Sequence, residues 1–120
     1  MKHVLIVDDD RSLCETLADG LSVRGFSVSI SNDAAACLER LDQEEFDAVL
    51  CDLRMPEVDG IALTSKIRAS RPDLPVVFIS GYSREEVPMP AEVRDHAGFL
   101  QKPFQMNQLV QVLERFRRSH

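Results

Sequence analysis

Several features are scarce or absent in this sequence, and each absence narrows the class of protein. No apolar run approaches the roughly 20 residues of a membrane-spanning helix, and the first three residues lead into a strand-like segment rather than a signal peptide. Basic residues are outnumbered, with 14 Lys and Arg against 20 Asp and Glu, for a formal net charge of −6. A phosphate backbone would repel such a domain. We therefore expect a cytoplasmic protein without direct nucleic-acid or membrane binding.

Cysteines are few and odd in number. Cys14, Cys37 and Cys51 form no C-x-x-C pair and no metal-ligand spacing with a histidine. An odd number in a chain without a signal peptide indicates reduced thiols in a reducing compartment. All three lie among apolar residues, which predicts that they pack in the core. A redox role for Cys51, which precedes Asp52, is the less favoured alternative.

The chain does contain a regular alternation of strand and helix patterns. Continuous apolar runs predict strands buried on both faces at residues 4–7, 46–53 and 76–79. Alternation over 26–30 predicts a half-exposed edge strand, and 99–101 a short last strand. Helical spacing predicts helices from Asp10 to Gly25, over 34–43 with Asn32 or Asp33 as N-cap, and over 106–116. Another helix follows Asp59-Gly60, interpreted as a cap and turn, and ends near Arg71.

The stretch between residues 83 and 97 has the weakest helical pattern. Pro88 and Pro90 each remove a backbone donor and push the preceding residue out of helical geometry. The fourth helix is therefore predicted to be short or irregular. We expect a shortened helix over roughly 91–97 that starts with Pro90, after an irregular, mobile loop over 83–89.

Five alternations of strand and helix predict one α/β domain over residues 1–120, with a parallel sheet covered by helices on both faces. In such open sheets functional groups collect beyond the carboxyl ends of the strands. Asp8 and Asp9 follow the first strand, Asp52 ends the third, Ser80 ends the fourth and Lys102 follows the fifth. Each alone has a structural alternative, such as a helix cap, a turn or a surface charge. Their convergence on one edge favours a functional site.

These residue types suit phosphoryl chemistry. Three neighbouring carboxylates repel one another unless a cation lies between them. Oxygen ligands with few protein donors suit Mg²⁺, which keeps several waters. A carboxylate can attack phosphorus to give an aspartyl phosphate, and a metal, a lysine and a hydroxyl can stabilise the transition-state charge.

Four ordered motifs resemble the receiver domains of response regulators in two-component signalling. They are Val4-Leu5-Ile6-Val7-Asp8-Asp9, Leu50-Cys51-Asp52-Leu53-Arg54-Met55-Pro56 with Asp59-Gly60, Phe78-Ile79-Ser80-Gly81-Tyr82, and Phe99-Leu100-Gln101-Lys102-Pro103-Phe104. The resemblance covers essentially the whole chain and is closest to receivers of hybrid sensor histidine kinases. It implies a flavodoxin-like, five-stranded parallel sheet in the order 2-1-3-4-5 with five helices.

The resemblance also implies a role for each site residue. Asp52 matches the phosphoacceptor and is also a metal ligand, Asp9 matches a direct Mg²⁺ ligand, and Asp8 a carboxylate that acts mostly through metal-bound water. The Arg54 backbone carbonyl matches a further metal ligand, and Lys102 the lysine that contacts the phosphoryl group.

Three more matches concern the response to phosphorylation. Ser80 matches the switch hydroxyl and Phe99 the aromatic residue that swings inward with it. The Lys102-Pro103 bond matches a cis peptide. Arg54 and Tyr82 flank the path of attacking water and are expected to tune the lifetime of the phosphoryl group.

We expect a phosphoacceptor switch rather than an enzyme with a separate substrate. Its partners are a histidine kinase or histidine phosphotransfer protein, and a downstream protein or attached output domain. One alternative is a pseudo-receiver that binds partners without phosphorylation, which the complete set of acids disfavours. A second alternative is a Mg²⁺-dependent phosphohydrolase that forms an aspartyl phosphate. It is disfavoured because such enzymes carry a D-x-D motif after the first strand, where this chain has the adjacent Asp8 and Asp9. In a flavodoxin relative, the triply acidic loop would repel the flavin phosphate.

Overall fold

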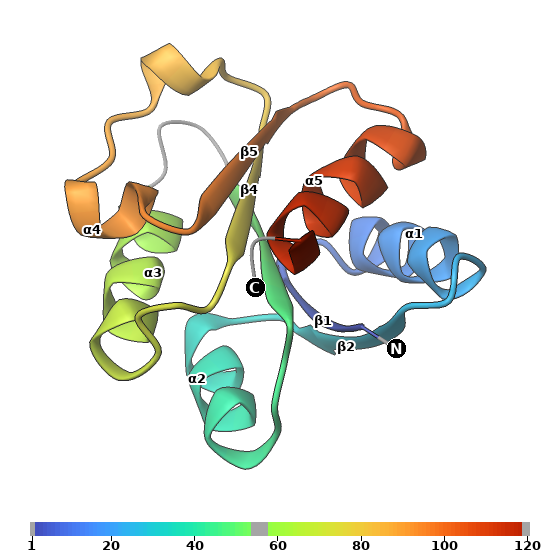
Figure 1. Ribbon diagram of the computed structural model, residues 1–120, viewed down its shortest axis with the longest axis horizontal. Helices are drawn as coiled ribbons and strands as arrows, with labels where there is room; N and C mark the ends of the chain where they lie inside the picture. Colours follow the sequence, from blue (N-terminus) through green and yellow to red (C-terminus); the bar gives the residue numbers. More distant parts are fainter. Residues whose placement is uncertain (1, 54–57, 119–120) are drawn as a thin grey trace.

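The computed structural model describes residues 2–53 and 58–118. Its strands are β1 (His3–Val7), β2 (Ser27–Ser31), β3 (Ala48–Leu53), β4 (Val76–Ser80) and β5 (Ala97–Gln101). All pair in parallel in one sheet of order β2-β1-β3-β4-β5, which confirms the predicted topology (Figure 1). The order reverses between β1 and β3, and such a switch point opens a crevice at the carboxyl ends of the strands.

The helices are α1 (Arg11–Ser22), α2 (Ala34–Gln43), α3 (Val58–Ser70), α4 (Ala91–Arg94) and α5 (Met106–Arg118), with one 3₁₀ turn, η1 (Arg84–Glu86). Over residues 2–53 and 58–118, no helix has the length and apolar character needed to cross a membrane. Asp10 caps α1 as predicted, because its carboxylate accepts from the Leu13 amide at 3.1 Å. Asp33 is the residue that caps α2, accepting from the Ala36 amide at 2.7 Å.

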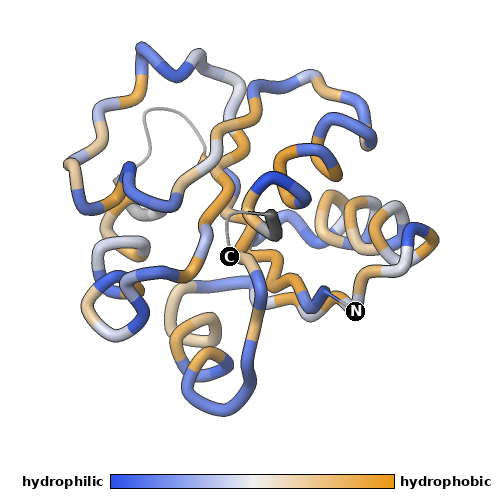
Figure 2. Tube along the Cα trace, in the orientation of Figure 1, coloured by the Kyte–Doolittle hydropathy of each residue, from blue (hydrophilic) through white to orange (hydrophobic). Residues whose placement is uncertain are grey.

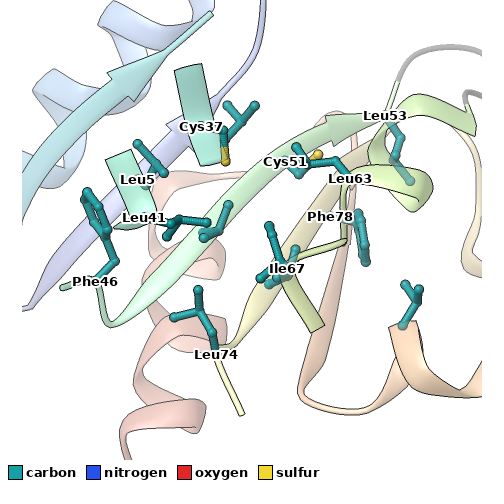
Figure 3. Packing of buried hydrophobic residues seen from close by; sticks show 14 of the residues in the cluster. Leu5, Cys37, Leu41, Phe46, Cys51, Leu53, Leu63, Ile67, Leu74 and Phe78 are labelled. Atoms are coloured by element: carbon teal, nitrogen blue, oxygen red, sulfur yellow. The ribbon is translucent and has the colours of Figure 1, made fainter. Parts of the chain in front are cut away.

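Two apolar clusters lie on opposite faces of the sheet, and the strands supply both. Figure 2 shows the hydrophobic colouring along the central strands. Along β1, Leu5 and Val7 face the cluster under α2, α3 and α4, which we call the α2–α4 cluster and which Figure 3 shows from close by. Val4 and Ile6 face the cluster under α1 and α5. Burial on both faces explains why the inner strands read as unbroken apolar runs.

The start of α3 corrects one prediction. The helix already includes Asp59 and Gly60, so this pair lies in its first turn and does not form a turn ahead of it. Gly60 is needed there because α3 lies very close to β3. A Cβ at position 60 would collide with Leu53 Cδ2 and lie 3.1 Å from Cys51 Sγ.

The segment before α4 is more regular than the sequence predicted. A short α4 is confirmed, although it ends at Arg94 rather than near residue 97. The predicted mobility of residues 83–89 stays a prediction, and their irregular backbone is confirmed except at η1, where the Ser83 amide donates to Glu86 Oε1 at 2.8 Å. This bond also lowers the pKa of the Glu86 carboxyl. Val87 is buried and Met89 packs against the α2–α4 cluster, so the segment has apolar anchors despite its prolines.

A buried arginine joins α4 to α3. The guanidinium of Arg68, on α3, donates to the main-chain carbonyls of Glu92 at 3.2 Å, Asp95 at 2.7 Å, His96 at 3.1 Å and Leu74. Only 8% of the Arg68 surface is exposed, and this desolvation lowers the pKa of the guanidinium. Carbonyls at a helix C-terminus need hydrogen-bond donors from outside the helix. The Arg68 guanidinium, which belongs to α3, provides such donors at the end of the four-residue helix α4.

Candidate functional site

The predicted residues gather at the carboxyl edge of the sheet. Asp8 and Asp9 follow β1, Asp52 is the second-last residue of β3, Ser80 is the last residue of β4, and Lys102 follows β5. These four strands are neighbours, so parallel pairing brings their ends together. The sequence prediction of their convergence is confirmed.

Hydrogen bonds on several sides hold the acidic turn after β1. The Asp8 amide donates to the Ser31 carbonyl at 3.1 Å, and one Asp8 carboxylate oxygen accepts from the Asp10 amide at 3.1 Å. The Asp8 carbonyl accepts from Asn32 Nδ2 at 2.8 Å and from the Cys14 thiol at 3.4 Å. Asp8 is buried while Asp9 is exposed, so the two acids present one sheltered and one open carboxylate.

Asp52 and Lys102 form an ion pair at the centre of the site. The Lys102 ammonium lies 3.0 Å from Asp52 Oδ1, and only 3% of the Asp52 side chain is exposed. Burial of a carboxylate is costly unless it is paired with a cation and hydrogen-bonded. Lys102 provides that pairing while 37% of its own side chain stays accessible. The pair therefore places a sheltered Asp52 carboxylate next to a partly accessible Lys102 ammonium.

Ser80 lies beside this pair. Its main-chain carbonyl accepts from the Lys102 amide at 2.6 Å, and its hydroxyl oxygen accepts from the Tyr82 amide at 2.9 Å. Ser80 is fully buried, and its strand neighbour in the pair β4–β5 is Gln101. The Lys102-Pro103 peptide is cis, as the resemblance implied. Phe99 is half-buried, packs against the α2–α4 cluster and does not line the acidic site.

A cavity of about 400 Å³ opens in front of the acids. Asp8, Asp9 and Asp52 line it together, and so do Asn32 and Lys66, which the sequence prediction missed. Asn32 directly follows β2, so the rule that residues just after parallel strands gather at the carboxyl edge of the sheet could have identified it. Lys66 lies inside α3 and carries no such signal in the sequence.

The donors of this cavity fit Mg²⁺. All three carboxylates are hard oxygen ligands, and Asp9 and Asp52 are the two expected to bind the ion directly. Within residues 2–53 and 58–118, no three His, Cys, Asp or Glu side chains are arranged to hold a metal by themselves. Mg²⁺ keeps several waters and takes only one or two protein carboxylates, which the three acids lining this cavity can supply. The predicted Arg54 carbonyl ligand lies outside the described residues.

The cysteines are structural, as predicted. Cys14, Cys37 and Cys51 are free thiols and all are buried. Burial, followed by the charge of Asp8, raises the pKa of Cys14 to about 11, and burial raises the pKa of Cys51 to about 12. Thiols with such pKa values are protonated at neutral pH and are weak nucleophiles. Their environment therefore supports packing over a redox role.

Fold and site together define an α/β domain with an acidic cavity at the carboxyl edge of its sheet, and comparison with known proteins agrees. The response regulator receiver domain matches residues 4–114. The chain is 33% identical over 115 residues to the response regulator receiver protein CpdR of Brucella abortus, covering 96% of both. It is 38% identical over 112 residues to the transcriptional regulatory protein ZraR of Escherichia coli, which covers 93% of this chain and 25% of ZraR. The chain thus spans about a quarter of the length of ZraR.

Solved structures show the same fold. A sensor protein from Polaromonas sp. JS666 has a TM-score of 0.85 at 27% identity, covering 98% of this chain and 97% of that one. A CheY-like receiver domain protein from Methanospirillum hungatei has a TM-score of 0.83 at 26% identity, covering 100% and 99%. The chain therefore belongs to the response regulator receiver domain family, whose members are phosphorylation-controlled switches in two-component signalling.

Proposed function

We propose that Asp52 accepts a phosphoryl group from a phosphohistidine on a histidine kinase or a histidine phosphotransfer protein, in a Mg²⁺-dependent reaction. The observation that carries this proposal is the buried Asp52 carboxylate, held 3.0 Å from the Lys102 ammonium and sharing a cavity with two further acids. Asp52 is the one carboxylate of the site that belongs to a central strand, so its position is the most rigid of the three.

In the proposed transfer, an Asp52 oxygen attacks the phosphorus and forms an O–P bond. The N–P bond to the donor histidine breaks, and its electron pair returns to the imidazole. Lys102 follows the phosphoryl oxygens, because its ammonium is a compact charge on a long stem. Asp9, Asp52 and the Arg54 carbonyl would hold Mg²⁺, with Asp8 acting through metal-bound water. Bound there, the ion would supply neutralising charge for the phosphoryl oxygens.

The same geometry supports Ser80 as the residue that senses phosphorylation. Its hydroxyl oxygen accepts from the Tyr82 amide at 2.9 Å, and rotation of the side chain toward a phosphoryl group would carry this acceptor away from the amide. Losing that bond alters the start of the segment that leads to η1 and α4. Phe99 pairs with Phe78 across β4 and β5 and packs against the same cluster as Tyr82. A movement of Ser80 that shifts Tyr82 would therefore act on the same apolar cluster that Phe99 contacts.

The proposed unit is a receiver domain over residues 1–120 that is a phosphoacceptor and not an enzyme with its own substrate. It acts alone or joined to an output domain, since relatives of both lengths match it. The net charge of −6 supports a domain that itself avoids nucleic acid. Three unpaired thiols support a reducing, cytoplasmic location.

Phosphorylation with acetyl phosphate tests the acceptor. Intact-mass spectrometry with Mg²⁺ should show one added phosphoryl group on the wild type and none on Asp52→Asn. Asp42→Asn, which changes an exposed carboxylate of α2, is the matched control and should label like the wild type. Equal labelling of wild type and Asp52→Asn would refute the assignment. Steady hydrolysis of small phosphate esters would instead support the phosphohydrolase.

A Mg²⁺ titration followed by NMR tests the ligand assignment. Asp9→Ala should abolish binding, because Asp9 is a proposed direct ligand. Asp10→Ala should retain the metal and lose only a helix cap, which typically contributes about 1 kcal/mol. The opposite result, with metal lost in Asp10→Ala and kept in Asp9→Ala, would show that the assigned ligands are displaced by one residue.

A further inference from the structure

Asn32 occupies the junction between β2 and the acidic turn. It follows Ser31, the last residue of β2, whose carbonyl accepts the Asp8 amide at 3.1 Å. From this position Asn32 Nδ2 donates to the main-chain carbonyl of Asp8 at 2.8 Å. A carbonyl oxygen only accepts, so the amide nitrogen is the Asn32 atom that must face it. The loop after β2 thus holds the turn after β1 from the side.

This bond controls more than the Asp8 carbonyl. The carbonyl of Asp8 and the amide of Asp9 belong to one rigid peptide plane. Fixing the Asp8 carbonyl therefore fixes the rotation of this peptide plane and the direction in which the backbone of Asp9 continues from it. The other donor that the structure records on this oxygen is the Cys14 thiol at 3.4 Å, which is a weak donor. Asn32 is the stronger of the two constraints.

Asn32 is not needed to begin α2. The cap of that helix is the next residue, Asp33, whose carboxylate accepts the Ala36 amide at 2.7 Å. Asn32 is half-buried instead, and it lines the cavity together with Asp8, Asp9 and Asp52. A side chain that only completed a turn would have no reason to contact an acidic residue 24 positions earlier.

We propose that Asn32 is a positioning residue for the metal site, which orients the Asp8–Asp9 peptide so that the Asp9 carboxylate is aimed into the cavity. This inference rests on the proposed function of Asp9 as a Mg²⁺ ligand. Asn32 itself is not a ligand. Side chains that orient metal ligands in this indirect way typically change metal affinity by about 10-fold to 100-fold when they are removed.

The test compares wild type, Asn32→Ala and Asn107→Ala, which truncates an exposed amide on α5 far along the chain. NMR titration should show Mg²⁺ binding about 10-fold weaker in Asn32→Ala and unchanged in Asn107→Ala. The Mg²⁺ concentration for half-maximal phosphorylation by acetyl phosphate should rise by the same factor, while the rate at saturating Mg²⁺ is retained. Without metal, amide exchange over residues 8–10 should become faster in Asn32→Ala alone.

Each outcome separates the inference from the proposed function. Wild-type affinity and unchanged exchange at residues 8–10 in a folded Asn32→Ala would overturn the role of Asn32 and leave the Asp9 assignment intact. A wild-type protein that binds no Mg²⁺ would instead overturn the proposed function. If Asn32→Ala does not fold, Asn32→Ser provides the same comparison, because its shorter hydroxyl donor should weaken binding and unaltered binding would refute the proposal.

Discussion

The Arg68 guanidinium provides a quantitative test of what holds the short α4 in place. In Arg68→Met the apolar stem is kept and four donated hydrogen bonds are lost. A single hydrogen bond to a charged group typically contributes a net of about 1.5–3 kcal/mol to stability, so simple addition of four would give roughly 6–12 kcal/mol. That sum overstates the loss. Burial of the charge opposes folding, as the lowered pKa of Arg68 indicates, and this cost disappears with the side chain.

The acceptors reduce the loss further. Glu92, Asp95 and His96 are exposed, so water can reach their carbonyls once Arg68 is gone. Leu74 is buried, and one unsatisfied buried acceptor costs about 1–3 kcal/mol. We therefore expect Arg68→Met to lower the free energy of unfolding by about 2–4 kcal/mol.

Urea unfolding measures this difference, and Arg68→Lys is the matched variant. It keeps the charge but cannot reach four acceptors with one ammonium, so it should fall between wild type and Arg68→Met. Amide exchange should quicken over residues 91–97 in both variants while β1 stays protected. An unchanged urea midpoint in Arg68→Met, or faster exchange spread evenly over the sheet, would refute the role of Arg68 as the link between α3 and α4.

Three further predictions concern single buried positions. Gly60→Ala should destabilise by about 1–3 kcal/mol, because the collision with Leu53 outweighs the gain in helix propensity; a more stable variant in urea would contradict this packing. Ser31→Ala should raise the urea midpoint, corresponding to up to about 1 kcal/mol, since the buried Ser31 hydroxyl has no hydrogen-bond partner in the described part of the chain; a lower midpoint would reveal an unrecognised partner. The pKa values of Cys37 and Cys51 are raised from 9.0 to about 11 and about 12, so the folded protein holds these protons longer than the unfolded chain does. The contribution of these two thiols to the free energy of unfolding is complete below pH 9 and is lost as the pH rises through 9 toward 12. Between about pH 8 and about pH 10, the urea midpoint should therefore fall more steeply in wild type than in a Cys37→Ala/Cys51→Ala double variant. Parallel curves of midpoint against pH would exclude the effect.

The sheet and the acidic edge could be predicted because each leaves a local signal. Strands buried on both faces are unbroken apolar runs, and the residue after each run lies at the same edge of a parallel sheet. The sequence therefore predicts that Asp52 and Lys102 meet although they are 50 positions apart in the chain. The short α4 was predictable for an equally local reason, since Pro88 and Pro90 prevent a longer helix.

The contacts that hold these elements in place carried no such signal. Nothing in the spacing around Arg68 shows that its guanidinium bonds carbonyls more than 20 residues away. Asn32 looked like one of two possible helix caps, and the choice between it and Asp33 depended on backbone geometry. The 3₁₀ turn η1 was missed because its stabilising partner is an exposed Glu86, whereas the prolines beside it dominated the pattern.

The order of the strands in the chain makes the acidic edge one of the last features of this domain to be assembled as the chain is synthesised. Asp8 and Asp9 leave the ribosome early, but β1 needs β2 and β3 as neighbours on both sides. Lys102 is synthesised only after β5, and α5 must then still cover the face of the sheet that carries the cluster under α1 and α5. A nascent chain that stops after β4 contains Asp8, Asp9 and Asp52 but lacks Lys102, whose ammonium pairs with Asp52. The acidic edge is therefore complete only in a domain that includes β5, because Lys102 supplies the ammonium that pairs with Asp52.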